Sequence, residues 1–95
     1  MGGALERSNI DDTDYDGEHG KRWYYRLYSD STGEWFWEPR LPTPAEVAAP
    51  HTYRGVSWEP MILTEAEWPT VELRGPYTLR GNAITVAEDW FDLIR

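Results

Sequence analysis

The sequence predicts an α+β fold that is mainly antiparallel β, with two hairpins, about four to six short strands, short helical turns and a C-terminal helix. Three observations carry this prediction. Two aromatic-rich segments flank a cluster of turn residues, a Gly-Asn pair separates two further short segments, and apolar side chains near the C-terminus recur with a helical period. The chain of 95 residues has no cysteine, so its core must come from packing of its six Trp, six Tyr and two Phe side chains.

The first predicted hairpin joins residues 21–29 to residues 34–38. The segments KRWYYRLYS and EWFWE are rich in residues that favour strands, and Asp-Ser-Thr-Gly between them favours a turn. A four-residue loop would place Tyr28 opposite Trp35, Leu27 opposite Phe36 and Arg26 opposite Trp37.

The two faces of this hairpin follow from the alternation of side chains along a strand. One face would carry Trp23, Tyr25, Leu27 and Phe36, and the other would carry Tyr24, Arg26, Tyr28, Trp35 and Trp37. Neither face is polar, so the hairpin is either packed on both sides or exposes one aromatic face. Because Arg beside Trp and Tyr is typical of interface hot spots, we predict that the second set of five residues binds a partner.

The remaining predicted elements are short. Residues 56–63 hold a strand interrupted by Pro60, and residues 70–74 alternate apolar and polar side chains as a strand does. Residues 77–80 and 83–86 flank Gly81-Asn82, which suits a two-residue hairpin turn. Residues 87–94 are expected to be helical, because Val86, Trp90 and Ile94 recur four residues apart.

An internal repeat of the form W-E-P-x-Φ-x-T-x-A-E, where Φ is apolar, occurs at residues 37–46 and 58–67. Its Thr-x-x-Glu half is a capping box, so Thr43 with Glu46 and Thr64 with Glu67 are each expected to begin a short helix. Pro50 and Pro69 would end these helices early. The repeat is explained either by similar strand-to-turn transitions or by a degenerate duplication.

The net charge of −8 is concentrated near the N-terminus. Residues 1–20 contain six acids and one base, a charge of −5, and the rest of the chain carries −3. This Gly- and Asp-rich segment has too few apolar side chains to offset the entropy of ordering it. We therefore predict a flexible acidic tail at residues 1–20 and one small α+β domain at residues 21–95.

The predicted tail contains one candidate metal site. The segment Asp12-Thr13-Asp14-Tyr15-Asp16-Gly17 resembles the D-x-D-x-D-G start of EF-hand-type calcium loops, which makes Asp12, Asp14 and Asp16 the candidate ligands. Trp23 stands where such a loop carries its bidentate Glu. A solvated acidic segment is the alternative interpretation.

Several classes of function have little support. His19 and His51 lie in no motif with a nucleophile, and a chain this short leaves little room for a substrate cavity of about 300–1,000 Å³. We expect no enzyme activity and no cofactor. We expect no direct binding of nucleic acid, because such binding needs a basic face and the chain is acidic. We also expect no membrane partner, because no segment approaches the roughly 20 apolar residues of a membrane span.

The leading hypothesis is a small non-enzymatic protein-binding module that acts as an adaptor, an inhibitor or a virion component. Small acidic proteins with more Arg than Lys are frequent among bacteriophage and accessory genes, and that is the setting we expect. Without a secretory signal, the expected location is the host cytoplasm, or the virion. The alternative is an acidic decoy, meaning an immunity protein or a nucleic-acid mimic that occupies a basic cleft. Carbohydrate binding through stacked Trp and Tyr is a third possibility.

Overall fold

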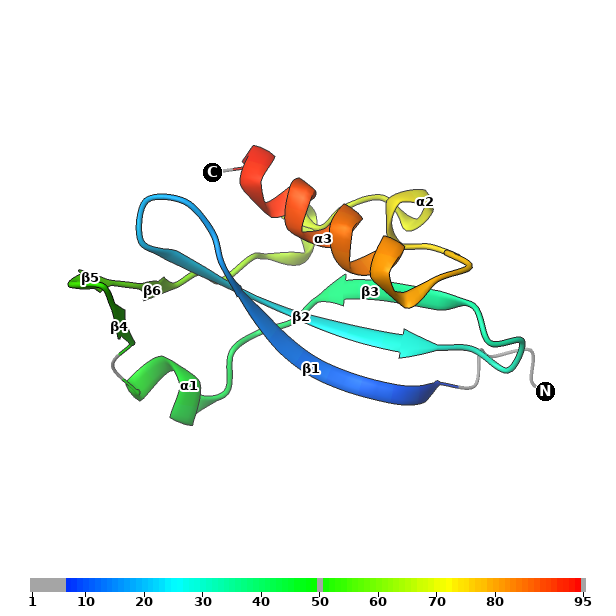
Figure 1. Ribbon diagram of the computed structural model, residues 1–95, viewed down its shortest axis with the longest axis horizontal. Coiled ribbons are helices and arrows are strands. Elements are labelled where there is room, and N and C mark those ends of the chain that lie inside the picture. Colours follow the sequence, from blue (N-terminus) through cyan, green and yellow to red (C-terminus); the bar gives the residue numbers. More distant parts are fainter. Residues whose placement is uncertain (1–6, 50, 95) are drawn as a thin grey trace.

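The computed structural model describes residues 7–49 and 51–94, and it confirms the α+β fold (Figure 1). Its main sheet has the order β1 (Ser8–Asp16), β2 (Lys21–Ser29) and β3 (Trp35–Pro39), and these neighbours pair antiparallel. The short strand β6 (Glu59–Pro60) pairs in parallel with the beginning of β2. A separate two-stranded hairpin consists of β4 (Thr52–Tyr53) and β5 (Val56–Ser57).

The helices are α1 (Pro44–Ala48), a 3-10 turn (Glu65–Glu67), α2 (Val71–Arg74) and α3 (Arg80–Ile94). In Figure 1, α3 lies across β2 and β3, whereas α1 lies at the other side of the sheet, near the β4–β5 hairpin. No helix in the described part of the chain has the length and apolar character that a membrane crossing requires.

The β2–β3 hairpin is confirmed, but its register differs from the prediction by one residue. Leu27 lies opposite Trp37, and Tyr28 lies opposite Phe36. The physical reason lies in the loop, where the Asp30 carboxylate accepts hydrogen bonds from the N–H groups of Thr32 (2.9 Å) and Glu34 (3.0 Å). This side chain stabilises a loop that is one residue longer than the one expected.

A shift of one residue moves a side chain to the other face of a sheet. Trp35 and Trp37 therefore lie on the face of Trp23, Tyr25 and Leu27, and the prediction that they share a face with Tyr24, Arg26 and Tyr28 is wrong.

The core lies between this first face and α3. Ala83, Ala87 and Phe91 of α3 are buried against it, and the Phe91 ring stacks on Trp23 with 5.1 Å between ring centroids. Trp37 is 0% exposed. Each such ring contributes a large buried apolar area, so a few of them close the core of a short chain.

Two predicted strands are helical instead. Gly81 and Asn82 do not form a hairpin turn but lie in the first turn of α3, because Ala83 continues the four-residue spacing of Ala87 and Phe91. Residues 71–74 form α2, whose preceding Thr70 hydroxyl accepts a hydrogen bond from the Leu73 N–H at 3.4 Å.

The predicted flexible tail is also wrong over β1. Residues 1–6 lie outside the described residues, but residues 8–16 form a strand that pairs with β2. An irregularity in the register between Ser8 and Asp11 limits the regular part of the pairing to residues 11–16. On the core side, the Tyr15 hydroxyl of β1 donates to the Asp92 carboxylate of α3 at 2.8 Å.

The two repeat copies both place Thr at the start of a helical turn. Glu46 accepts from the Thr43 N–H (2.8 Å) and donates its own N–H to the Thr43 hydroxyl (3.2 Å), which confirms the first capping box. In the second copy, the Glu67 carboxylate accepts from the Thr64 N–H at 2.9 Å, and the helix is a single 3-10 turn.

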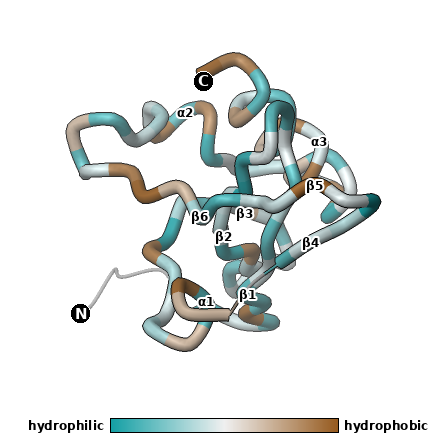
Figure 2. Tube along the Cα trace, turned by 90° about the vertical axis from the view of Figure 1, so that its left-hand side faces the viewer, coloured by the Kyte–Doolittle hydropathy of each residue, from teal (hydrophilic) through white to brown (hydrophobic). Residues whose placement is uncertain are grey.

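The hydrophobic stretch of tube beside β6 in Figure 2 is residues 61–63, of which Met61 and Leu63 pack against the core.

Candidate protein-binding site

The face of the sheet opposite α3 combines aromatic rings with charged side chains, and we call it the charged face. Its residues come from all three long strands and from the residue that follows β3: Asp12, Asp14, Asp16, Arg22, Tyr24, Arg26, Tyr28, Phe36, Glu38 and Arg40. Asp12, Asp14 and Asp16 lie on β1 and Arg22 and Arg26 on β2, whereas Glu38 lies on β3 and Arg40 follows it, because period-two spacing places alternate residues of each strand on this face.

Three acids of β1 form ion pairs with β2. Arg26 Nε donates to Asp12 at 2.5 Å, and Arg22 pairs with both Asp14 and Asp16. Cross-strand pairs of opposite charge stabilise a sheet, although exposed pairs contribute little individually. Together, these pairs explain why an Asp-rich segment with few apolar side chains is ordered.

Arginines cover the tyrosines of the charged face. The Arg7 guanidinium lies 4.4 Å from the Tyr28 ring centroid, and the Arg40 guanidinium lies 5.1 Å from that of Tyr24. Tyr28 also stacks on Phe36, with 5.4 Å between centroids. These arginines therefore help to bury the rings of Tyr24 and Tyr28 on the side of the sheet opposite α3.

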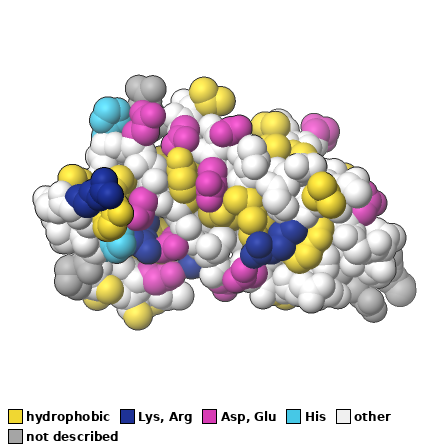
Figure 3. All heavy atoms as spheres, in the orientation of Figure 1, with side chains coloured by type: hydrophobic (Ala, Val, Ile, Leu, Met, Phe, Trp, Pro, Cys, Tyr) yellow, Lys and Arg dark blue, Asp and Glu magenta, His cyan; other side chains and the backbone are white. Residues whose placement is uncertain are grey.

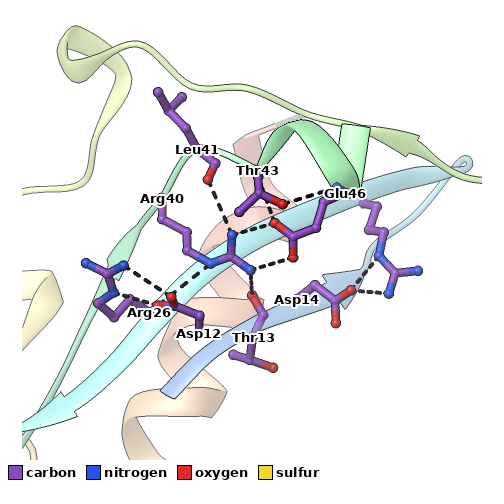
Figure 4. A network of polar contacts seen from close by, with 9 residues as sticks. Asp12, Thr13, Asp14, Arg26, Arg40, Leu41, Thr43 and Glu46 are labelled. Carbon is purple, nitrogen blue, oxygen red and sulfur yellow. Dashed lines mark hydrogen bonds and ion pairs between the residues drawn. The ribbon is translucent and has the colours of Figure 1, made fainter. Parts of the chain in front are cut away.

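Arg40 is the centre of the polar network in Figure 4. It donates to both carboxylate oxygens of Glu46, at 2.7 and 2.9 Å, and to the Thr13 carbonyl of β1 at 3.4 Å. Asp12 lies 3.9 Å from its Nε. The side chain of Arg40 is only 10% exposed, so the end of β3, the middle of β1 and the start of α1 are held together by one buried guanidinium.

The pKa shifts on this face maintain its charges. Hydrogen bonds from Arg40 lower the pKa of Glu46 to about 2, and the bond from Arg26 lowers the pKa of Asp12. In return, Glu46 raises the pKa of Arg40, and Asp12 raises the pKa of Arg26. Burial raises the pKa of the Tyr24 hydroxyl and holds it neutral.

An open groove of about 400 Å³ borders the charged face where it meets the edge of β3. Leu41 and Trp68 add apolar surface to it, and the Leu41 side chain is 62% exposed. The lining residues are Arg7, Asp12, Arg26, Glu38, Pro39, Arg40, Leu41, Thr43 and Trp68. We call this feature the groove.

The five predicted binding residues are divided between the faces. Trp37 and Trp35 belong to the core side, and Tyr24 and Tyr28 lie buried under arginines. Arg26 lines the groove with a half-exposed side chain. The rings thus form no exposed aromatic platform, which also removes the flat stacking surface that carbohydrate binding would need.

The calcium-loop prediction is wrong in its geometry. Asp12, Asp14 and Asp16 lie on an extended strand rather than on a loop, where Arg22 and Arg26 pair with them, and His51 Nε2 lies 3.0 Å from Asp16. Across residues 7–49 and 51–94, no cluster of three or more His, Asp or Glu side chains has an arrangement that would hold a metal ion.

Sequence reasoning missed the residues that organise the groove. The capping box identified Glu46 but did not predict that its carboxylate also accepts hydrogen bonds from Arg40. That contact depends on the position that α1 takes beside the end of β3. Asp12, Asp14 and Asp16 alternate as Arg22 and Arg26 do, and this common period of two could have predicted two paired strands. Leu41 is the apolar position of the repeat, but neither it nor Trp68 stands in a pattern that predicts a binding residue.

Comparison with protein-family models, with curated proteins and with solved structures finds no match to this chain. The site must therefore be interpreted from its own geometry.

Proposed function

We propose that this protein is a small non-enzymatic protein-binding module whose partner occupies the groove. The observation that carries this proposal is the meeting of exposed Leu41 and the Trp68 ring with Arg26 and Arg40 in one open groove. Trp and Arg are enriched among residues that dominate binding energy, and an apolar centre with a polar rim is the usual anatomy of an interface.

The rigidity of the groove supports the same proposal. Arg40 is fixed by Glu46 and by the Thr13 carbonyl, and Arg26 is fixed by Asp12. Side chains that are already ordered lose less conformational entropy when a partner binds. A preorganised surface of this kind would suit an adaptor, an inhibitor or a virion component.

The charges of the groove support binding more than catalysis. The lowered pKa values of Asp12 and Glu46 keep both carboxylates ionised near pH 7, whereas a general acid or base works best with a pKa near the operating pH. Arginine is not a proton donor in this range.

The acidic decoy is the weaker alternative. A decoy needs free carboxylates on a rigid surface, and the strand β1 supplies the rigidity. Its Asp12, Asp14 and Asp16, however, are paired with Arg22 and Arg26. In Figure 3, basic side chains lie beside acidic ones across the middle of the face shown, whereas its upper part carries acidic side chains without basic ones.

The test is affinity capture from cells that naturally contain the protein, with mass spectrometry of what is retained. We compare the wild-type chain with Leu41→Ala and Trp68→Ala, and with Leu93→Ala as the matched control. Leu93 is 82% exposed on α3, on the opposite side of the sheet. Leu93→Ala therefore removes the same kind of exposed apolar side chain as Leu41→Ala, but at a site away from the groove. Circular dichroism establishes that each variant is folded.

We expect one protein to be captured by the wild type and by Leu93→Ala, and to be lost or strongly reduced with both groove variants. Loss with Leu93→Ala and retention with Leu41→Ala would contradict the proposal. A partner that both groove variants retain, and that raised ionic strength releases, would favour the decoy.

A further inference from the structure

In the part of the chain that the structure describes, the strand β1 pairs with another strand along one edge only. It pairs with β2 alone, and none of the other strands in residues 7–49 and 51–94 pairs with its outer side. The main chain of such an edge offers unpaired N–H and C=O groups to another extended segment.

The register identifies which groups face outward. The Gly17 N–H donates to the Lys21 carbonyl at 2.8 Å, and the antiparallel pairing continues through Tyr15 with Trp23 and Thr13 with Tyr25. Because bonded and non-bonded pairs alternate in an antiparallel ladder, the odd residues of β1 bond to β2. The N–H and C=O groups of Asp12, Asp14 and Asp16 therefore face outward.

A contact on the other side of β2 supports this assignment. The Arg40 N–H donates to the Tyr24 carbonyl at 3.1 Å, so Tyr24 uses its main chain toward the β3 side. Its cross-strand partner on β1 is Asp14, whose main-chain groups consequently face away from β2.

The same three residues also set the chemistry of the edge. A segment added along it would place alternate side chains beside the carboxylates of Asp12, Asp14 and Asp16, on the charged face. A second copy of β1 would bring Asp beside Asp, which is unfavourable, and uncharged segments would gain nothing from these carboxylates.

We infer that the outer edge of β1 accepts an extended segment of a partner protein that carries Arg or Lys at alternate positions. These carboxylates already pair with Arg22 and Arg26 of β2, so a basic segment would not meet free acids but would extend the alternation of charge that runs from Glu38 through Arg26 to Asp12. The irregularity between Ser8 and Asp11 ends the regular edge, so the segment spans about five residues of β1.

This inference concerns the edge of the sheet, which shares only Asp12 with the groove, and it does not rest on the proposed function. One partner can use both surfaces, but each has its own test. Leu41→Ala, which alters the groove, is expected to leave binding at the edge unchanged.

The test uses the full chain and two synthetic peptides of identical composition. One alternates Arg with Thr, and the other has its Arg residues in one block. Residue-resolved amide hydrogen exchange by NMR follows the Asp12, Asp14 and Asp16 N–H groups, and titration gives the affinities. We expect the alternating peptide to slow exchange at these three amides and to bind about fivefold or more tightly than the block peptide.

Equal affinity of the two peptides would mean general charge attraction and would overturn the inference. It would also be overturned if the alternating peptide failed to bind, or if it slowed exchange only elsewhere. These outcomes do not affect the groove proposal, because that proposal is tested separately, by the loss of the captured protein in Leu41→Ala and Trp68→Ala.

A matched pair of variants isolates the main-chain contribution. Asp14→Asn and Asp14→Pro both remove the carboxylate, but only Pro removes the outward N–H, and an edge strand tolerates Pro at such a position. We expect the alternating peptide to bind Asp14→Pro about fivefold more weakly than Asp14→Asn. Equal binding by the two folded variants would overturn the inference. The peptide comparison on the wild-type chain decides the matter if Asp14→Pro does not fold.

Discussion

Arg40 donates to both carboxylate oxygens of Glu46, at 2.7 and 2.9 Å, and thereby joins the end of β3 to α1. The same guanidinium lies over the Tyr24 ring and reaches the Thr13 carbonyl of β1. On the other face of the sheet, α3 covers the aromatic side chains. On this face a layer of paired arginines covers them instead, and the groove lies at its border.

Replacing Arg40 is expected to destabilise the fold. Arg40→Ala removes two charge-assisted hydrogen bonds and leaves the Glu46 carboxylate half-buried without its cation, a loss of about 2–3 kcal/mol in the free energy of unfolding. Urea denaturation measures it. Arg54→Ala, in the exposed turn of the β4–β5 hairpin, is the control and should change stability by about 0.5 kcal/mol or less. Equal losses for the two variants would show that the Arg40 network does not stabilise the fold.

Glu46 gives a dependence of stability on pH. Its pKa is lowered from 4.5 to about 2 in the folded chain, so its contribution is complete above pH 4.5 and disappears as the pH falls toward 2. The difference in unfolding free energy between the wild type and Glu46→Gln should be roughly 1 kcal/mol near pH 7, because the carboxylate is partly screened by solvent. Denaturation of both proteins over this pH range should show the difference narrowing on the acid side. A difference that stays constant down to pH 2 would refute the assignment.

Trp37 tests the assignment of the two faces. Trp37→Ala should cost about 3–5 kcal/mol, because this ring is fully buried beside Trp90 and Phe91. Leu93→Ala removes an exposed apolar side chain and should cost about 0.5 kcal/mol or less. Chemical denaturation compares them. If Trp37→Ala left the stability unchanged, Trp37 would belong to the surface and the predicted register would be the correct one.

Gly75 and Gly33 form a matched pair for a prediction on backbone geometry. Both have positive φ, at 137° and 85°. A Cβ on Gly75 would lie 2.6 Å from Phe36 Cδ2 and 2.8 Å from the Trp35 carbonyl oxygen, whereas nothing lies within 4 Å of one on Gly33. Gly75→Ala should therefore cost about 2 kcal/mol more than Gly33→Ala, which carries only the backbone strain of about 1 kcal/mol. Thermal or chemical denaturation checks the difference, and similar losses would contradict the close approach of Gly75 to β3.

Local patterns predicted a large part of the fold. The aromatic segments gave the β2–β3 hairpin, and the Thr-x-x-Glu spacing gave the starts of α1 and of the 3-10 turn. The register failed because the Asp30 carboxylate stabilises a longer loop, which composition alone does not reveal. The start of α3 was missed because Gly81-Asn82 is a good turn pair, and only burial of Ala83 against the sheet favours the helix.

The candidate site was less predictable than the fold. Its decisive contacts join residues far apart in the sequence, such as Asp12 with Arg26 and Arg7 with Glu38. From its composition, the Asp-rich segment at residues 8–16 is typical of a solvated tail. It is ordered because the turn after it places Arg22 and Arg26 of β2 beside its carboxylates. Arg26 was selected for its aromatic neighbours, but it lies in the groove because of its register with Asp12 and Glu38.

The most direct test of the central claim, that a protein partner binds in the groove at the border of the charged face, is amide hydrogen exchange of the full chain with and without the partner captured from its native cells. We predict that binding slows exchange around Asp12, Arg26 and Leu41 and leaves the exposed side of α3 around Leu93 unchanged. Protection confined to α3, with the residues of the groove unaffected, would contradict the account.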